Sequence, residues 1–143
     1  MKTLATNKKA KFEYEIKTTF VAGLILSGAE TKSIKSGNVS LNGSYVTISG
    51  NSVNLLNCHI GPYKYANQKN YDPTGTRKLL LNKKEIDELL GKEKSLVLIP
   101  LEILETGKGW VKIRIGVGKM RKKADKRDYI KKRETQKEIR ESF

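Results

Sequence analysis

The chain has 143 residues and a net charge of +14, from 29 Lys and Arg against 15 Asp and Glu. Its lone cysteine, Cys58, excludes an intramolecular disulfide and indicates a reducing compartment, so we expect a cytoplasmic protein. No stretch approaches the roughly 20 apolar residues that a membrane-spanning helix needs, so we expect no membrane contact.

The first 40 residues predict two strands and a helix. The residues before position 12 are polar and basic, and Phe12, Tyr14 and Ile16 then share one face, which predicts that a strand begins near position 12. A second strand over 21–26 is interrupted by Gly23. A short helix follows over 29–36 and ends before a glycine cap.

The middle of the chain predicts short strands and then a long loop. The expected strands cover 39–41, 45–48 and 53–60. They are separated by Asn42-Gly43 and Gly50-Asn51, which are turn pairs typical of hairpins. From 61 to 75 the composition shifts to Pro, Tyr, Asn, Lys and Asp, which indicates a surface loop of a length that often carries function.

A helix and a hairpin complete the expected body. Asn82 has the side chain of an N-cap, Glu85 follows three residues later as in a capping box, and Gly91 marks the end of the helix. The runs 96–104 and 110–117 are rich in β-branched residues and are joined by a glycine-containing turn. They predict a two-stranded hairpin with one apolar face.

These elements predict a mainly β fold. Six or seven short strands with two or three short helices fit a small barrel, because the connections are too short for repeated crossovers. We expect a closed β-barrel of the oligonucleotide-binding type over residues 1–118. Such barrels bind oligonucleotides with charged and aromatic side chains.

The last 25 residues, 119–143, form a basic tail. They carry 11 Lys and Arg against 5 Asp and Glu, a net +6, which leaves +8 on residues 1–118. A segment with this charge and little apolar pattern is expected to stay extended until it meets phosphates, with RNA as the first partner to consider. The alternative is a tail that only solubilises the chain.

Catalysis finds no support in the sequence. Cys58 and His59 are neighbours in an expected strand, so their side chains point to opposite faces, and neither has a third metal ligand nearby. No carboxylate pair or phosphate-binding glycine loop can be assigned. We expect a protein that is not an enzyme and that needs no metal or other cofactor.

A second RNA signal comes from tyrosines interleaved with cations in and after the long loop. The residues are Tyr63, Tyr65 and Tyr71 with Lys64, Lys69, Arg77 and Lys78. Tyrosine rings stack on unpaired bases, while ammonium and guanidinium groups hold the backbone. A tyrosine-rich loop without RNA contact is the alternative.

Several ordered motifs together resemble the SsrA-binding protein family. They are Asn7-Lys8-Lys9-Ala10-Lys11, Ala22-Gly23, Gly28-Ala29-Glu30-Thr31-Lys32-Ser33-Ile34, Ser44-Tyr45-Val46, Ile60-Gly61-Pro62-Tyr63, Asp72-Pro73 and Arg77-Lys78-Leu79-Leu80-Leu81. Asp125-Lys126-Arg127 and 130–134 resemble the tail of the family. The resemblance covers nearly the whole chain.

This resemblance implies an adaptor for ribosome rescue by trans-translation. The barrel would hold the transfer-RNA-like domain of transfer-messenger RNA (tmRNA). The tail, disordered when free or helical when bound, would enter the decoding centre and the empty message channel of a stalled ribosome. The implied partners are tmRNA, the ribosome with its RNA, and elongation factor Tu indirectly through aminoacylated tmRNA. We expect the protein to act as a monomer.

The same resemblance implies two sets of site residues. The set for the transfer-RNA-like domain is Asn7, Lys8, Lys9, Lys11, Tyr14, Arg77, Lys78, Asn82 and Lys83. The set for the ribosome and its decoding centre is Lys119, Arg121, Lys122, Lys123, Lys126, Arg127, Lys131 and Arg133. Their expected role is contact with phosphates.

The chain departs from the family pattern at three positions. Val21 stands where the family has an acidic residue, Ala124 where it has a histidine, and Met120 near its usual glycine. These departures remove a base contact and a tail group that could stack. The alternative functions are a basic structural ribosomal protein or a general RNA-binding protein of the oligonucleotide-binding fold.

Overall fold

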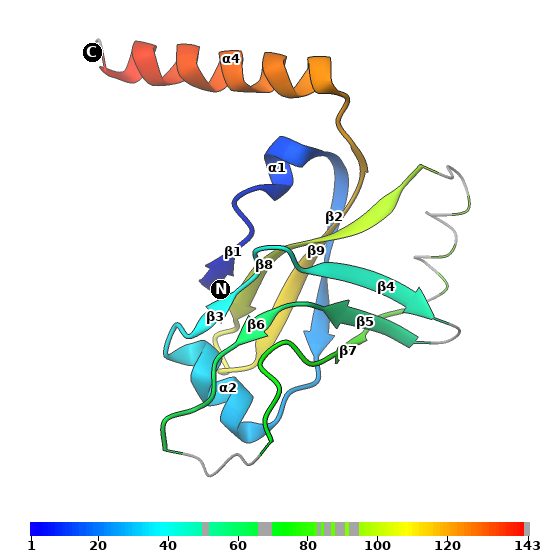
Figure 1. The fold of residues 1–143 in the computed structure, drawn as a ribbon, viewed down its shortest axis with the longest axis vertical. Coiled ribbons are helices and arrows are strands. Elements are labelled where there is room, and N and C mark those ends of the chain that lie inside the picture. Colours follow the sequence, from blue (N-terminus) through cyan, green and yellow to red (C-terminus); the bar gives the residue numbers. More distant parts are fainter. Residues whose placement is uncertain are drawn as a thin grey trace.

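The computed structural model describes residues 1–49, 52–65, 70–82, 84, 87, 91 and 95–141. Most of them form one curled antiparallel sheet with a helix at either end and a long C-terminal helix above it (Figure 1). The strands are β1 (Lys2–Thr6), β2 (Tyr14–Leu24), β3 (Val39–Ser40), β4 (Tyr45–Ser49), β5 (Ser52–Leu56), β6 (His59–Ile60), β7 (Arg77–Leu80), β8 (Val97–Glu105) and β9 (Val111–Met120). The helices are α1 (Ala10–Glu13), α2 (Gly28–Lys35) and α4 (Lys123–Glu141).

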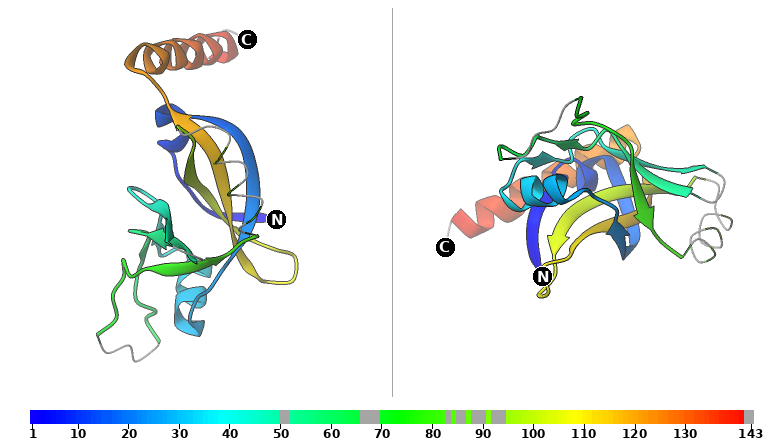
Figure 2. Two further views of the ribbon diagram at one scale, coloured as in Figure 1. Left: turned by 90° about the vertical axis from the view of Figure 1, so that its right-hand side faces the viewer. Right: turned by 90° about the horizontal axis from the view of Figure 1, so that it is seen from below.

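The main sheet runs in the order β1-β8-β9-β2-β7-β5-β4, and β3 pairs with β6 beside it. The long pairing of β2 with β9 lies at the centre of the sheet, next to the β8–β9 hairpin. The register shifts between Ile16 and Thr18 in β2 and between Pro100 and Glu102 in β8. Such irregularities increase the twist, and they also accommodate a proline that cannot donate to the ladder. The sheet therefore curls strongly (Figure 2).

Close approach of β2 to β9 depends on a glycine. A Cβ on Gly118 would overlap the carbonyl oxygen of Glu15, which lies next to the shifted register of β2. When the backbone of a neighbouring strand comes this close to a glycine, no side chain fits at that position. The last residues of β9, Lys119 and Met120, still pair with Glu15 and Tyr14. The sheet therefore extends two residues past position 118.

The core lies inside the curl and is closed at one end by α2. Its fully buried large side chains are Ile34, Leu41, Leu55, Ile60, Ile103, Ile113, Ile115 and Val117. Each such side chain stabilises the fold by roughly 1.5–3 kcal/mol relative to an exposed position. Ser27 caps α2 through a capping box with Glu30, and Gly37 at φ +89° follows its end.

The mainly β fold with few helices is confirmed, whereas closure of the barrel is not. The edge strands β1 and β4 do not pair with each other in the described part of the chain. Instead, β4 lies within contact distance of β8. The predicted helix over 29–36 and the predicted hairpin are confirmed as α2 and β8–β9, each within one to three residues.

Three sequence predictions differ from the structure. Phe12 lies in α1, not at the start of a strand, and the strand predicted over 21–26 is the end of one continuous β2. The predicted strand 53–60 is divided into β5 and β6, because Asn57 adopts a left-handed φ of 59°. The strands β1 and β7 were not predicted. The helix predicted from Asn82 to Gly91 falls largely outside the described residues.

Candidate nucleic-acid interface

The N-terminal segment before α1 is pinned to β8. The backbone N–H of Asn7 donates to the carbonyl of Leu101 at 2.8 Å, and its side-chain Nδ2 donates to the carbonyl of Pro100 at 2.9 Å. Ala10, at the start of α1, is buried. These contacts hold a four-residue helix that is too short to be stable alone. They also leave Lys8, Lys9 and Lys11 exposed to solvent.

A hollow of about 530 Å³ opens beside this segment, between the sheet and the start of the tail. Its charged and aromatic lining consists of Lys8, Lys11, Tyr14, Glu102, Arg114, Arg121 and Tyr129. Four of these side chains are cationic and one is a carboxylate. Since Arg114 is paired with Glu102 at 3.1 Å, the remaining charge of the hollow is positive. Rings and cations in one concavity suit phosphates and bases.

Arg121 anchors the tail to α1. Its backbone N–H donates to the carbonyl of Glu13 at 2.8 Å, and its Nε donates to the carbonyl of Lys11 at 3.1 Å. Its guanidinium carbon lies 4.8 Å from the ring centre of Tyr129, and Lys126 Nζ lies 5.8 Å from that of Phe12. These cation–π contacts fix the direction in which α4 leaves the body (Figure 1).

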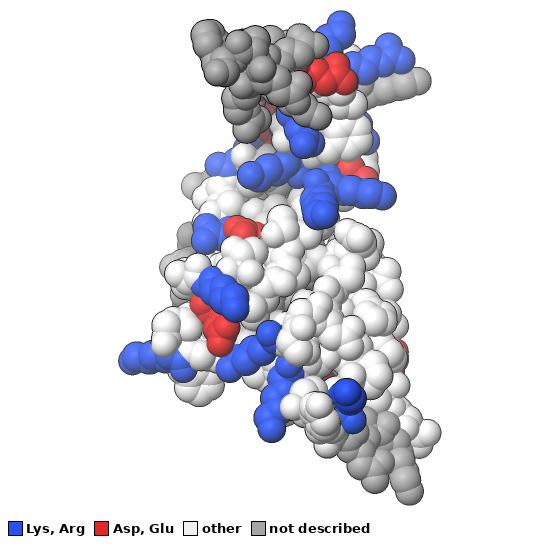
Figure 3. Space-filling view, turned by 90° about the vertical axis from the view of Figure 1, so that its left-hand side faces the viewer, with Lys and Arg blue, Asp and Glu red and all other residues white. Residues whose placement is uncertain are grey.

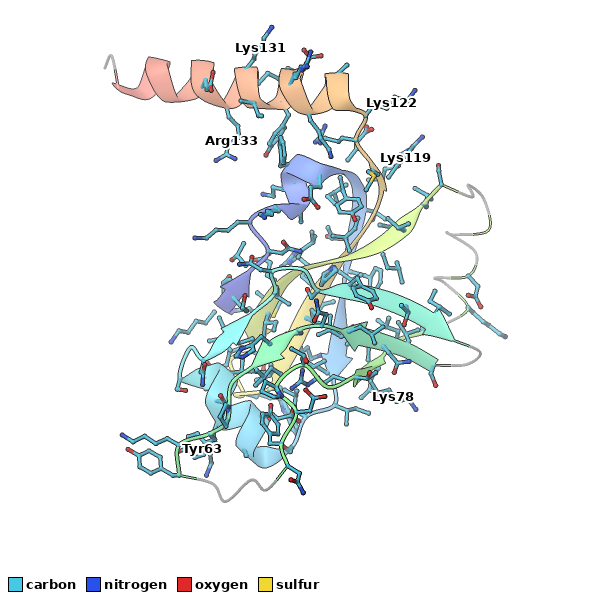
Figure 4. All side chains as sticks on the ribbon, viewed as in Figure 1. Tyr63, Lys78, Lys119, Lys122, Lys131 and Arg133 are labelled. Carbon is cyan, nitrogen blue, oxygen red and sulfur yellow. The ribbon has the colours of Figure 1, made fainter. Side chains whose placement is uncertain are left out.

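The tail carries cations both before α4 and on more than one side of that helix. Lys122, Arg127, Lys131 and Arg133 are exposed, whereas Lys119, Arg121 and Lys126 are half-buried. Lys131 points away from the body, whereas Arg133 lies on the opposite side of α4, which faces the body (Figure 4). On the face drawn in Figure 3, Lys and Arg side chains also gather on the body just below α4. The side chain of Lys123 lies outside the described set.

Arg77 has a different environment from the other predicted site residues. It is only 4% exposed, and it forms an ion pair with Glu30, with Nη2 at 2.8 Å from Oε2. Nη1 donates to the carbonyl of Cys58 at 2.6 Å, and Nη2 donates to the hydroxyl of Tyr71 at 3.0 Å. In β7 the side chains alternate, so Arg77 faces inward while Lys78 faces solvent. The guanidinium therefore joins β7 to α2 and to the residue just before β6, from within the fold.

The buried network shifts the ionisation of its members. Burial raises the pKa of Glu30, but hydrogen bonds from the Ser27 backbone and from Arg77, with the charge of Arg77, outweigh it and lower that pKa overall. Burial, opposed by the charge of Arg77, raises the pKa of the Cys58 thiol to about 11. Burial and the charge of Glu30 raise the pKa of the Tyr71 hydroxyl. Glu30 therefore stays ionised and Cys58 stays a thiol at neutral pH.

The predicted site residues fall into separate groups. Asn7, Lys8, Lys11 and Tyr14 meet Arg121 around the hollow, whereas Lys9 faces a smaller neighbouring hollow of about 340 Å³. Lys78 and Asn82 are exposed elsewhere, at and after β7, and Lys83 lies outside the described residues. Figure 4 shows Lys78 far from the tail cations.

Three charged or aromatic residues of the hollow, Glu102, Arg114 and Tyr129, were not predicted as site residues. A signal for Arg114 was present, because it alternates with apolar residues along β9 and so faces outward.

Cys58 and His59, the two residues weighed above as a metal or nucleophile pair, lie on opposite sides of the chain at the start of β6. Cys58 is fully buried and its neighbour His59 is exposed, so the predicted opposite orientation is confirmed. No group of three His, Cys, Asp or Glu side chains there could hold a metal ion. Among the described helices, none combines the length and the apolar character that crossing a membrane requires.

Known proteins match this chain over nearly its full length. The family model described as SmpB protein matches residues 4–143. The SsrA-binding protein of Geobacillus sp. (strain WCH70) is 46% identical over 144 residues, covering 99% of this chain and 92% of the relative. The SsrA-binding protein of Bacillus subtilis (strain 168) is 42% identical with the same coverage.

A solved structure has the same fold. It is described as "tmRNA-SmpB: a journey to the center of the bacterial ribosome", and it superposes with a TM-score of 0.66 at 38% identity. The match covers 82% of this chain and 84% of that chain. Both the sequence motifs and the curled sheet with its cationic extension thus agree with one group of proteins. The chain belongs to the SmpB protein family.

Proposed function

We propose that this protein is an RNA-binding adaptor that binds tmRNA and delivers it to stalled ribosomes for trans-translation. The observation that carries the proposal is the joint likeness in sequence and fold to SsrA-binding proteins and to the tmRNA-SmpB structure. A positive hollow and a cationic helix at the same end of the molecule supply the chemistry for RNA. The adaptor makes no covalent bond itself.

The body and the tail have different RNA partners. Lys8, Lys11, Tyr14 and the exposed Lys78 contact the transfer-RNA-like domain, and Asn7 positions the N-terminal segment through its two bonds to β8. Arg77 likewise acts by positioning, since its guanidinium is buried. The cations of α4 contact ribosomal RNA at the decoding centre and in the empty message channel. Elongation factor Tu meets the protein only through aminoacylated tmRNA.

The curled sheet is a partly open barrel of the oligonucleotide-binding type. What supports this is the strong curl, the register shifts in β2 and β8, and the approach of β4 to β8 without a ladder between β4 and β1. Barrels of this type are partly open. The protein acts in the cytoplasm as a monomer, at the ribosome.

A binding competition tests the adaptor role. The full chain is titrated against labelled tmRNA and against an unrelated structured RNA of equal length, at physiological salt. We expect tmRNA to be bound at least tenfold more tightly, because specific contacts persist when counterion release is weakened. Equal affinity for both RNAs at that salt concentration would reject the proposal. Measurements at low salt do not discriminate, since a chain of charge +14 binds any RNA there.

A further inference from the structure

Two tyrosines and two lysines lie together at the surface, at the far end of the molecule from α4: Tyr63, Tyr65, Lys32 and Lys64. We call them the tyrosine edge; Tyr65 and both lysines are exposed, and Tyr63 is half-buried. The two rings lie edge to face, with centres 5.5 Å apart and planes at 69°. Lys32 Nζ is 5.7 Å from the ring centre of Tyr63, and Lys64 Nζ is 5.4 Å from that of Tyr65. Figure 4 shows Tyr63 pointing outward there.

The base of this edge is held firmly to α2. Ser33, which is 1% exposed, donates its hydroxyl to the carbonyl of Gly61 at 2.6 Å. The N–H of Gly61 donates to the carbonyl of Asn38 at 3.0 Å, and a Cβ on Gly61 would overlap the Asn38 side chain. Only a glycine therefore lets the chain pass this closely over the end of α2. The residues that follow it start from a fixed position next to Lys32.

A second set of hydrogen bonds holds the part of the loop that leads into β7. The hydroxyl of Tyr71 donates to the carbonyl of Ile60 at 2.9 Å and accepts from Arg77, and the N–H of Ile60 donates to the carbonyl of Pro73 at 2.9 Å. Tyr71 is thus used inside the fold. Tyr63 and Tyr65 are not members of the core cluster, and Tyr65 is 77% exposed. A ring as exposed as that of Tyr65, beside a half-buried ring and on a fixed base, indicates a surface suited to contact with a partner.

The charges around the edge select the ligand. Each ring has an ammonium group over or beside it, whereas the nearby carboxylates are engaged: Glu30 by Arg77, and Asp72 by the N–H and hydroxyl of Thr74. Cations next to exposed rings match a phosphate backbone with unpaired bases, because rings stack on bases while ammonium groups neutralise phosphates.

We propose that the tyrosine edge is a separate RNA-binding site that stacks one or two unpaired bases of the bound RNA. This proposal rests on the adaptor function and extends it, since it adds a contact at the opposite end of the molecule from α4 (Figure 4). An RNA held at both ends has its orientation on the protein fixed, in addition to its affinity.

The test compares matched variants of the full chain. The double variant Tyr63→Leu/Tyr65→Leu removes the rings, and Tyr63→Phe/Tyr65→Phe keeps them as the control. Dissociation constants are measured for tmRNA and for an unstructured RNA of about eight nucleotides, at several salt concentrations. Circular dichroism melting confirms that both variants fold. We expect the leucine variant to bind both RNAs about tenfold more weakly than the phenylalanine control.

The salt dependence separates stacking from charge. Removing rings should leave the slope of log affinity against log salt unchanged, whereas Lys32→Gln/Lys64→Gln should lower it by about 0.7 for each phosphate that is no longer neutralised. If the leucine and phenylalanine variants bind both RNAs within twofold of each other, the proposal is overturned, as it is if only ribosome binding falls. Failure of the wild-type chain to prefer tmRNA would instead reject the adaptor function.

Discussion

Arg77 and Arg121 show two opposite uses of the same side chain, at the α2 end and at the α4 end of the molecule. Arg77 is buried and contacts a carboxylate, a carbonyl and a hydroxyl, so its charge is neutralised inside the fold. Arg121 is half-buried and contacts a carbonyl oxygen and a tyrosine ring, neither of which carries a formal negative charge. The first arginine therefore contributes to folding, and the second keeps its charge for phosphates.

Removing the tail tests the role of the α4 end and should have the largest effect on function. A chain that ends after Met120 keeps the pairing of β9 with β2 through Tyr14 and lacks all of α4. We expect the melting temperature to stay within a few degrees and tmRNA to remain bound. Peptide tagging on stalled ribosomes in a cell-free system should fall to background. The slope of ribosome affinity against salt should decrease by about 0.7–0.9 for each phosphate that the tail no longer neutralises.

The control for this truncation is a full-length chain in which Arg127, Lys131 and Arg133 are all replaced by Gln. It keeps the helix and removes three exposed positive charges. We expect an intermediate loss of tagging, because the phosphate contacts add up. If the truncated chain still tags peptides, α4 has no role in the message channel, and the division between a folding end and a ribosome-contacting end is wrong.

Replacing Arg77 tests the role of the α2 end in the stability of the fold. Arg77→Ala leaves Glu30 with its charge in a partly buried place and deprives the Cys58 carbonyl of its donor. We expect a loss of about 3–5 kcal/mol in the free energy of unfolding, measured by urea titration. Lys78→Ala, one residue along β7 but facing solvent, should change it by less than about 0.5 kcal/mol and should weaken RNA binding. Equal stability of the two variants would contradict the positioning role.

This pair of residues also shows what the sequence could and could not predict. Alternation in Arg77-Lys78-Leu79-Leu80 places Arg77 on the same face as buried Leu79, but four residues are too short to separate a strand from the approach to a helix. The side of β7 that faces the core is therefore not identifiable from the sequence, and Arg77 looks like one more cation for RNA.

Whether the other elements can be predicted depends on the length of the sequence pattern that each of them carries. The β8–β9 hairpin and α2 are predictable because each has a long alternation or a complete set of caps in local sequence. The register shift at Ile16 and the overlap site at Gly118 arise from pairing between segments about 100 residues apart, which leaves no local signal. The same holds for the anchor of Arg121 on the carbonyl of Lys11, 110 residues away. The sequence therefore predicts candidate site residues from their type, but in a strand as short as β7 it does not predict which of them face inward.

Acidic pH should lower the stability of the α2 end of the molecule, because Glu30 contributes to it only while its carboxylate is ionised. The pKa of Glu30 is lowered in the folded protein from its ordinary value of 4.5. Its contribution to stability is therefore fully present above about pH 5 and is lost as the pH falls through the folded pKa. Glu30→Gln keeps the capping-box geometry with Ser27 and removes the charge beside Arg77.

We expect Glu30→Gln to cost about 1.5–3 kcal/mol at pH 7, since hydrogen bonds to a charged group become neutral ones. The difference from wild type should shrink between about pH 5 and pH 3, measured as urea unfolding at each pH. A difference that stays constant over this range would show that the carboxylate charge contributes nothing. Glu15→Gln, on an exposed position of β2, is the matched control and should leave the stability within about 0.5 kcal/mol.

The smallest effect concerns the contact that sets the direction of α4. A double-mutant cycle with Arg121→Gln and Tyr129→Leu isolates the pair, because the backbone bond from residue 121 to Glu13 does not depend on either side chain. We expect a coupling of about 0.5–1 kcal/mol at this half-buried site, read from the population of docked α4 by fluorescence transfer between labels on the tail and on β1. The sheet should melt at the same temperature in all four proteins, because the core does not include these residues. A coupling near zero would mean that the contact between Arg121 and Tyr129 does not help to hold the tail, which would then depend on the carbonyl bonds of residue 121 and on the contact of Lys126 with Phe12.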